Sequence, residues 1–318
     1  MANDFNVTFW GVRGSYPVPG PSTLKIGGNS SCVQVEVAGR TIILDAGTGI
    51  IPLGKQLAKQ WFLRGDKRPG QRLSATLLIS HTHHDHLMGL PFFAPLFLPD
   101  ASLSFFGPSV YGPITNGRTD LKYVLDMLMD QMFFPVDLAE TASQKVFTTL
   151  KTSDRILLAE GSEPQVENSA NVSKGSVQDQ VVISQYRSYA HPKNGTLVYK
   201  IQFAGKTLVY ATDIEGYVLG DRKLIEFAKG ADILIHDSQY TEEQYGGAIP
   251  TQGFGHSTAA MACQVAKEAG VKQLFLFHHD PNHDDAMIAR KEEQARLIFP
   301  NTFAAYEGLV VSLGGNAL

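Results

Sequence analysis

Short apolar runs of β type alternate with amphipathic helical stretches along the chain. Residues 75–79 form a continuous apolar run of strand length, which indicates a strand buried on both faces. Residues 32–37 alternate between apolar and polar, and a glycine turn separates them from the apolar residues 41–44. Helical spacing follows at about residues 52–61. The first quarter of the chain therefore predicts strands of a sheet followed by a helix.

The second half repeats this order of strands and helices. The pattern predicts strands at 181–189, 196–203, 207–211, 233–235 and 273–277, and helices at 221–229, 257–269 and 284–298. We expect Ser257 to be the N-cap of the helix at 257–269. In the less regular middle, residues 118–132 have a helical period, and the polar residues 159–180 predict an exposed loop or insertion. These halves predict one α/β domain over residues 1–318, an αββα sandwich of two packed mixed β-sheets with helices on the outer faces.

Composition narrows the classes of protein that the chain can represent. Hydrophobic residues make up 43% of 318 residues, enough for a large core, and the net charge of −4 is unlike that of a strongly basic nucleic-acid binder. An RNA held by a local basic patch stays compatible with this charge. The two cysteines, Cys32 and Cys263, form neither a zinc-type pair nor a disulfide framework, so we expect a reduced, cytoplasmic setting. We expect no signal peptide and no membrane span.

Four of the ten histidines fall within the six residues from His81 to His86. At the end of a strand, residues i and i+2 point the same way, so His81 and His83 can bind one metal ion. Asp85 and His86 follow at the turn and suit a second ion, whereas His84 is out of register and is not expected to be a ligand. Imidazole and carboxylate ligands suit zinc, manganese or iron, and the lack of cysteine favours an open catalytic centre. The alternative is a histidine-rich surface loop without metal.

Further candidate ligands follow predicted strands in the second half. His191 precedes a proline, Asp213 ends an apolar strand, and His278 directly follows another strand. In α/β folds, catalytic and ligand-binding residues often lie at the ends of strands. The simpler alternatives are a turn-forming aspartate for Asp213 and a loop histidine for His191. We expect the adjacent His279 to point away from the site and His283 to lie on the surface.

Together these motifs resemble the metallo-β-lactamase superfamily over nearly the whole chain. Asp45, in the segment Leu44–Gly47, resembles the first aspartate motif of that superfamily, and we expect it to hydrogen-bond a ligand histidine. The resemblance implies a metallo-β-lactamase-like fold that holds two divalent metal ions. It implies that one ion is held by His81, His83, His191 and Asp213. It implies that the other is held by Asp85, His86, Asp213 and His278.

Three shorter segments resemble the phosphodiesterase branch, which contains the tRNA 3′-end-processing endonuclease ribonuclease Z and cyclic-phosphate phosphodiesterases. They are Gly11–Ser15, Gly27–Ser31 and Gly255–Ala259. In that branch a histidine, matched here by His256, pairs with the acidic residue of a His-Glu motif. The matching residue here is Asp237, so a shorter carboxylate replaces the glutamate. A simple loop histidine at a helix start is the alternative reading of His256.

These resemblances predict a dinuclear metal-dependent hydrolase, with zinc expected and manganese or iron as alternatives. We expect a phosphodiesterase that acts on cyclic nucleotides or related phosphodiesters through a metal-bridging hydroxide held by Asp213, with Asp85 also in the catalytic set. His256, oriented by Asp237, is expected to donate a proton to the leaving alkoxide. The partner is then a small-molecule or nucleotide phosphodiester, an RNA 3′ end is less favoured, and a homodimer is compatible. Two alternatives stay open: a hydrolase of carboxylic esters, thioesters or lactones, and an inactive metal-binding scaffold.

Overall fold

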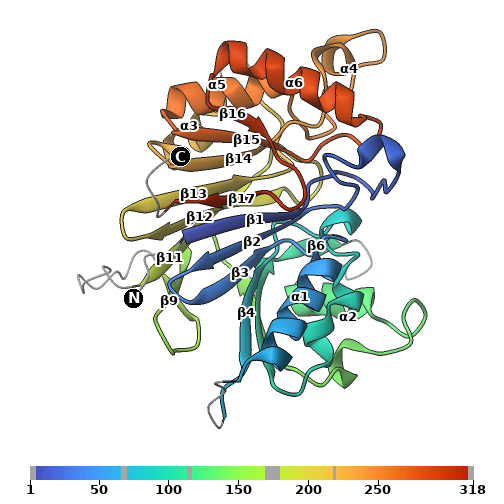
Figure 1. The fold of residues 1–318 in the computed structure, drawn as a ribbon, viewed down its shortest axis with the longest axis vertical. Helices are drawn as coiled ribbons and strands as arrows, with labels where there is room; N and C mark the ends of the chain where they lie inside the picture. The colour runs from blue at the N-terminus through green and yellow to red at the C-terminus, as the bar shows by residue number, and fades with distance from the viewer. Residues whose placement is uncertain (1–4, 66–69, 113–116, 169–179, 218–219, 314–318) are drawn as a thin grey trace.

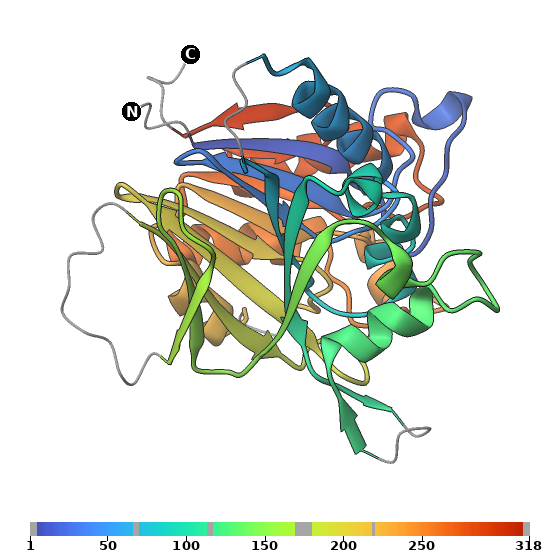
Figure 2. The same cartoon turned by 90° about the horizontal axis from the view of Figure 1, so that it is seen from below.

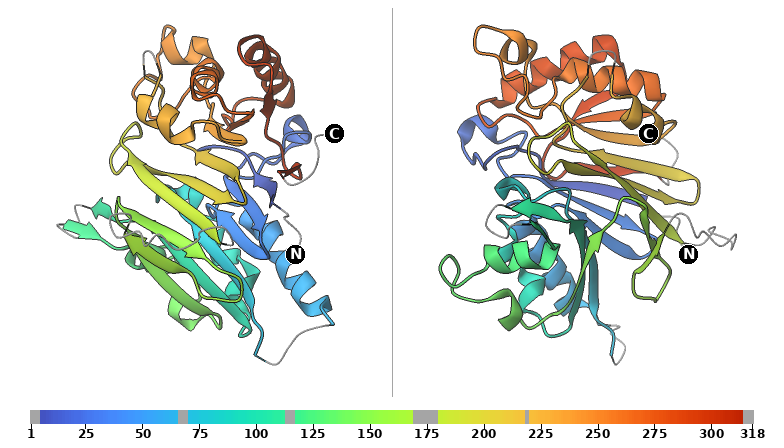
Figure 3. Two further views of the ribbon diagram at one scale, coloured as in Figure 1. Left: turned by 90° about the vertical axis from the view of Figure 1, so that its left-hand side faces the viewer. Right: turned by 180° about the vertical axis from the view of Figure 1, so that it is seen from behind.

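Two mixed β-sheets pack face to face, and helices cover their outer faces (Figure 1). The computed structural model describes residues 5–65, 70–112, 117–168, 180–217 and 220–313. Side views show the two layers of strands between the two groups of helices (Figure 3). The predicted αββα sandwich is confirmed.

The first sheet has the strand order β17-β1-β2-β3-β4-β5-β8, in which β3, β4, β5 and β8 run parallel. Its outer face packs against α1 and α2 through apolar side chains such as Leu53 and Leu125. The bounds are β1 (Phe5–Gly11), β2 (Cys32–Val37), β3 (Arg40–Leu44), β4 (Leu73–Leu78), β5 (Ala101–Pro108), β8 (Gln144–Leu150), β17 (Val310–Ser312), α1 (Ile50–Leu63) and α2 (Leu121–Leu128). Short 3-10 helices lie at η1 (Pro21–Thr23), η2 (His84–His86), η3 (Leu90–Phe92), η4 (Ala94–Phe97) and η5 (Leu138–Glu140).

The second sheet has the order β10-β9-β11-β12-β13-β14-β15-β16, and β13 to β16 run parallel. Apolar residues such as Leu224 and Val265 pack α3 and α5 on its outer face. The bounds are β9 (Asp154–Leu158), β10 (Gln165–Asn168), β11 (Val181–Ser188), β12 (Thr196–Phe203), β13 (Lys206–Ala211), β14 (Ile233–Asp237), β15 (Gln273–Phe277), β16 (Thr302–Ala304), α3 (Arg222–Ala228), α4 (Glu242–Gly246), α5 (Ala259–Ala269) and α6 (Asp285–Ile298).

The central core lies between the two sheets. Apolar side chains from both inner faces interdigitate there, with Phe9 of β1 against Phe275 and Phe277 of β15. Burial of these rings fixes how the sheets sit on each other, and therefore how the strand ends of one sheet face those of the other. A hairpin of β6 (Val110–Gly112) and β7 (Gly117–Thr119) projects from the body of the fold (Figure 2). No helix among the described residues is long and apolar enough to cross a membrane.

The segment 159–180 is only partly the exposed loop that its polarity predicts. Residues 165–168 form β10, an edge strand paired antiparallel with β9, so the loop prediction is wrong there. Polar side chains suit an edge strand, because its free side faces water. A prediction based on hydrophobic pattern therefore misses such a strand. Residues 169–179 lie outside the described residues.

Helix α5 begins later than its sequence predicts. Thr258, not Ser257, is the N-cap, and its side chain accepts a hydrogen bond from the Met261 amide. The Ser257 hydroxyl instead donates to the Ile214 carbonyl at 2.6 Å, which ties the start of α5 to the loop after β13. Either hydroxyl could serve as the cap, and a tertiary contact decided between them.

Three residues just beyond strand ends have left-handed backbone. Asp45 follows β3 (φ 62°), Asp213 lies two residues beyond β13 (φ 50°), and His278 follows β15 (φ 58°). Such a φ is uncommon for residues with a Cβ and costs on the order of 1 kcal/mol each, so it persists where the surroundings enforce it. All three strands end at the edge where the parallel strands present their carboxyl ends. Polar side chains therefore gather at that edge.

Candidate metal centre

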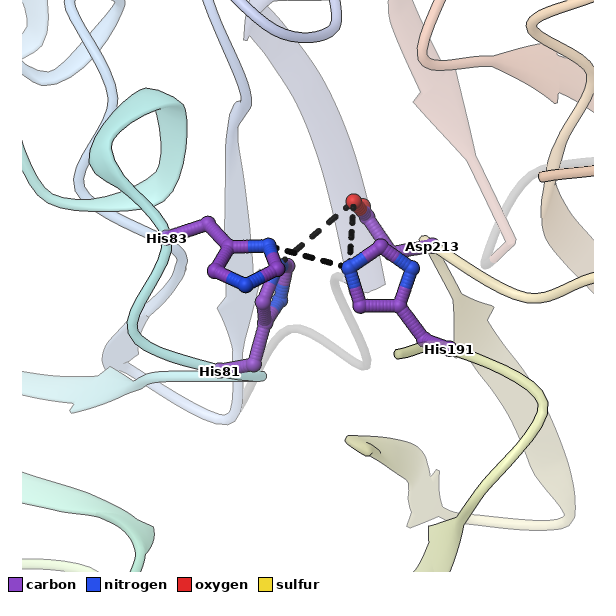
Figure 4. Close-up of side chains that lie close together, drawn as sticks. All are labelled: His81, His83, His191 and Asp213. Atoms are coloured by element: carbon purple, nitrogen blue, oxygen red, sulfur yellow. Dashed lines mark hydrogen bonds and ion pairs between the residues drawn. The ribbon is translucent and has the colours of Figure 1, made fainter. Parts of the chain in front are cut away.

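Four side chains from both sheets form the first group of donors (Figure 4). His81 and His83 come from the segment after β4, His191 follows β11, and Asp213 follows β13. Their donor atoms all lie within 4.8 Å of one another. The His191 Nε2 atom is 3.0 Å from His83 Nδ1, and the His81 Nε2 atom is 3.5 Å from Asp213 Oδ2. The structure thus brings together the first predicted ligand set.

Asp213 also belongs to the second group, which contains Asp85, His86 and His278. Its Oδ1 atom is 3.0 Å from His86 Nε2 and 3.2 Å from His278 Nε2, whereas its Oδ2 atom faces the first group. The Asp85 Oδ2 atom is 3.0 Å from His278 Nε2. One carboxylate therefore lies between two donor groups with one oxygen toward each, as a bridging ligand requires.

The donor spacing fits bound divalent cations. A tetrahedral zinc ion with bonds of about 2.0–2.1 Å places its ligands roughly 3.3 Å apart, close to the distances of 3.0–3.8 Å between these donors. The Nε2 atom of His81 is buried without a hydrogen-bond partner, a state that a cation would satisfy. Donors of nitrogen and oxygen without sulfur suit zinc, manganese or iron.

Burial favours unprotonated imidazoles in the first group. Burial, with the neighbouring His191, lowers the pKa of His83 to about 4, and burial also holds the pKa of His81 well below its usual range. In the second group burial alone would raise the pKa of Asp213, but His278 and His86 outweigh it and hold that pKa well below its usual range. Neutral imidazole and ionised carboxylate are the forms that bind metal.

Asp45 fixes the orientation of His86, as predicted. Its Oδ2 atom accepts hydrogen bonds from His86 Nδ1 at 2.8 Å, from the Ser80 hydroxyl at 2.8 Å and from the Tyr210 hydroxyl at 2.8 Å. Its Oδ1 atom accepts from the Ser80 amide at 2.7 Å. With Nδ1 held in this way, Nε2 of His86 points at Asp213 and Asp85.

Backbone groups orient two further donors. The amide of Ser15 donates to Asp85 Oδ2 at 2.8 Å, and the carbonyl of Gly255 accepts from His191 Nδ1 at 3.0 Å. A Cβ at Gly14 would lie 2.3 Å from the His278 ring. The segment Gly11–Ser15 therefore serves the centre by letting its backbone approach two ligand side chains closely.

His256 and Asp237 form a pair beside the second group. The His256 Nδ1 atom is 2.7 Å from Asp237 Oδ2, and the rings of His256 and His278 stack at 4.9 Å. The shorter carboxylate of Asp237 thus reaches the histidine. Burial alone would lower the pKa of His256, but the charge and hydrogen bond of Asp237 raise it to about 9. A histidine held in its protonated form can donate a proton near neutral pH.

The remaining predicted histidines lie apart from both donor groups. His84 is exposed, and His279 points away, with Nε2 donating to the Ala305 carbonyl at 3.0 Å. The surface position predicted for His283 is wrong: its exposed fraction is 4%, and its Nε2 donates to Gln244 at 3.0 Å. A polar histidine in a stretch of Asp and Asn resembles a surface residue, and its contacts with Gln244 of α4 and with Arg13 are tertiary.

Some residues that shape the centre were not predicted. The sequence pattern gives no role to Ser80, Tyr210 or Glu215. Ser80 and Tyr210 donate to Asp45, and Glu215 accepts from the glycine loop before His256. The position of Ser80 beside the histidine run was the one available signal. Tyr210 and Glu215 carry no local signal, because their partners lie far away along the chain.

Comparison with known proteins identifies the family of the chain. The chain matches the family described as "Beta-lactamase superfamily domain" over residues 40–279. It is 30% identical to ribonuclease Z of Synechococcus sp. (strain CC9605) over 281 residues, which cover 79% of this chain and 84% of that protein. It is 25% identical to ribonuclease Z of Picrophilus torridus, over 97% of this chain and 96% of that protein.

Among solved structures, the metallo-β-lactamase fold protein YhfI from Bacillus subtilis is similar in fold, with a TM-score of 0.61 and 17% identity over 98% of this chain and 99% of that one. Proteins of this superfamily use divalent metal ions, typically zinc. The chain belongs to the metallo-β-lactamase superfamily, in its ribonuclease Z and phosphodiesterase branch, and is a metal-dependent hydrolase.

Proposed function

We propose that this protein hydrolyses phosphodiesters, with cyclic nucleotides or related small phosphodiesters as substrates. The observation that carries the proposal is the position of Asp213 between two donor groups, with the His256–Asp237 pair beside them. We propose His81, His83, His191 and Asp213 as the ligands of one zinc ion. Asp85, His86, Asp213 and His278 are the proposed ligands of the other.

Metal ligands, positioning residues and a proton donor have separate roles in the proposed reaction. A bound pair of divalent cations supplies charge stabilisation for phosphoryl oxygens and lowers the pKa of water. Asp213 lies between the two donor groups with one oxygen toward each, and Asp45 accepts from His86 Nδ1, which turns Nε2 of His86 toward Asp213. The charge and hydrogen bond of Asp237 raise the pKa of His256 to about 9, so the ring is protonated on both nitrogens near neutral pH and can deliver its Nε2 proton to the leaving oxygen.

A panel of substrates on the zinc-loaded protein tests this function. We expect turnover of bis-p-nitrophenyl phosphate to exceed that of p-nitrophenyl acetate clearly. The His256→Ala variant should keep its metal content and lose roughly 10²- to 10⁴-fold in kcat on a cyclic nucleotide, whose leaving alkoxide needs a proton, and lose less on bis-p-nitrophenyl phosphate, whose p-nitrophenolate leaves as a stable anion. Faster turnover of the acetate would favour a carboxylic ester hydrolase, and full metal content without any turnover would favour a scaffold.

Processing of RNA 3′ ends is the second candidate. The relatives named ribonuclease Z align with nearly the whole chain, and that alignment is the observation in its favour. A precursor tRNA with a 3′ extension belongs in the same panel. Cleavage of this RNA at a kcat/KM above that of the small phosphodiesters would select the RNA function.

A further inference from the structure

A cavity of about 830 Å³ lies directly behind His191. Its lining includes Tyr189 and His191 after β11, Glu215 and Tyr217 after β13, and Tyr245 of α4, together with residues of the following loop and of α5. His191 belongs to both sites, since its Nε2 atom faces Asp213 in the first donor group. The cavity thus adjoins the first donor group through His191, and its volume falls within the range of about 300–1,000 Å³ for sites that bind small molecules.

Three tyrosines line this cavity, and the rings of two of them are largely exposed to solvent. The exposed fraction of Tyr189 is 69% and that of Tyr217 is 53%, although both tyrosines line a cavity beside a buried centre. The third ring is fixed, because the Tyr245 hydroxyl donates to Glu215 Oε1 at 2.8 Å. Exposed rings around a hollow offer stacking surfaces to a planar group.

The charge of the cavity excludes a phosphate there. Among the described residues that line it, no Lys or Arg occurs, and Glu215 carries a negative charge. That carboxylate already accepts from the amides of Gly253 at 2.7 Å and Gly255 at 2.9 Å, so it holds the wall in place. The amides of Gln252 and Gln264 also line the hollow and can pair with the polar edge of a ring.

We propose that this tyrosine cavity, defined by Tyr189, Tyr217 and Tyr245, binds the single nucleoside of a phosphodiester whose phosphorus lies at the metal centre. The inference rests on the proposed phosphodiesterase function and names its substrate class. A nucleobase is planar, uncharged and edged with donors and acceptors, and stacking on aromatic side chains needs no particular base. A longer RNA would bring further phosphates against Glu215, which favours a small nucleotide ester over an RNA chain.

Two esters with the same leaving group test the cavity in the zinc-loaded full chain. One is the p-nitrophenyl ester of thymidine 5′-monophosphate and the other is methyl p-nitrophenyl phosphate, which lacks the nucleoside. Tyr217→Ala should raise KM for the thymidine ester by about 5- to 100-fold and leave KM for the methyl ester unchanged. Tyr217→Phe should restore most of the affinity for the thymidine ester that Tyr217→Ala loses, because the ring remains. Tyr123→Ala is the matched control, because Tyr123 lies on α2, which packs on the first sheet, and is not among the residues that line the cavity.

The outcomes separate this inference from the proposed function. Equal effects of Tyr217→Ala on both esters, or no effect on either, would overturn the tyrosine cavity as a nucleoside site. If neither ester is hydrolysed, the proposed function fails, and calorimetric titration with thymidine, which has no phosphate to bind the metal centre, then tests the cavity alone. Binding as tight in Tyr217→Ala as in the wild type would reject it. Preferential cleavage of a 3′-extended RNA, insensitive to Tyr217, would reject the restriction to a single nucleoside.

Discussion

Two buried aspartates each orient one histidine of the centre. Asp45 holds Nδ1 of His86, and Asp237 holds Nδ1 of His256, at 2.8 and 2.7 Å. The two aspartates themselves are fixed by further donors, among them the Ser80 amide for Asp45 and the Ser257 amide for Asp237. Each histidine thus presents Nε2 in a defined direction, one toward the donor groups and the other toward the proposed substrate.

Replacing Asp45 should weaken metal binding. In Asp45→Asn the His86 ring loses its charged acceptor, and we expect the zinc affinity of the second group to fall about 10- to 100-fold. Competition with a chromophoric chelator measures this affinity. Tyr210→Phe is the control, because it removes one donor to Asp45 and leaves the carboxylate on His86, so its effect should be smaller. An affinity equal to that of the wild type in Asp45→Asn would contradict this role.

Replacing Asp237 should move the alkaline limb of activity. Asp237 raises the pKa of His256 to about 9, so a proton donor at His256 stays protonated up to about that pH and activity falls above it. In Asp237→Asn the pKa falls, and the decline in kcat/KM should begin at lower pH. The profile of kcat/KM from pH 6 to 10 measures this shift. Asp237→Glu, which restores the charge, should return the limb toward its original position, and an unmoved limb in Asp237→Asn would refute the assignment.

Helix α6 reaches the loop after β14 through a buried lysine. The Lys291 ammonium donates to the carbonyls of Ser238 and Gln239, directly after Asp237, and its exposed fraction is 4%. Burial lowers its pKa to about 8. A helix on the outer face therefore supports the strand end that carries Asp237.

This lysine should give a pH-dependent term in stability. The folded protein loses the Lys291 proton near pH 8, whereas the unfolded chain keeps it to about 10.5, so the burial penalty is present below pH 8 and is relieved as pH rises. The free energy of unfolding of the wild type, relative to Lys291→Met, should rise by about 2 kcal/mol from pH 7 to 9.5. Urea titrations at several pH values measure it. The exposed Lys229→Met should give a flat difference, and a flat difference for Lys291→Met would contradict the prediction.

The sequence predicted strands that have apolar runs. It did not predict elements whose position depends on contacts with distant parts of the chain. The strand at 196–203 has the predicted bounds because its side chains face cores on both sides. The edge strand β10 has no such burial, and its polar sequence resembles a loop. Ser257 and Thr258 are equally good caps, so the start of α5 depended on the contact with Ile214.

At the scale of the whole molecule, the donors are divided between the two sheets. His81, His83, Asp85 and His86 follow β4 of the first sheet, whereas His191, Asp213 and His278 follow strands of the second. The sequence shows the residue types of these donors plainly. The alignment of the two edges depends on core packing, which no local pattern contains.

Metal removal should therefore loosen the sandwich. Cations at about 1,000 times their dissociation constant stabilise a fold by about 4 kcal/mol, so stripping them with EDTA should lower Tm by roughly 5–15 °C. Differential scanning calorimetry with and without zinc measures this. His191→Ala should show a smaller difference than the wild type, and the exposed His84→Ala should match the wild type. An identical Tm with and without metal would contradict a link between the sheets.

The left-handed backbone at Asp45, Asp213 and His278 also governs how these positions can be probed. Asparagine adopts this conformation more readily than most residues with a Cβ, whereas alanine does not. An alanine scan would thus mix loss of a donor with a distorted chain path. Asparagine replacements change the donor while they keep the backbone conformation, and the difference between glycine and alanine at the same site would report the conformational penalty, because both lack the donor.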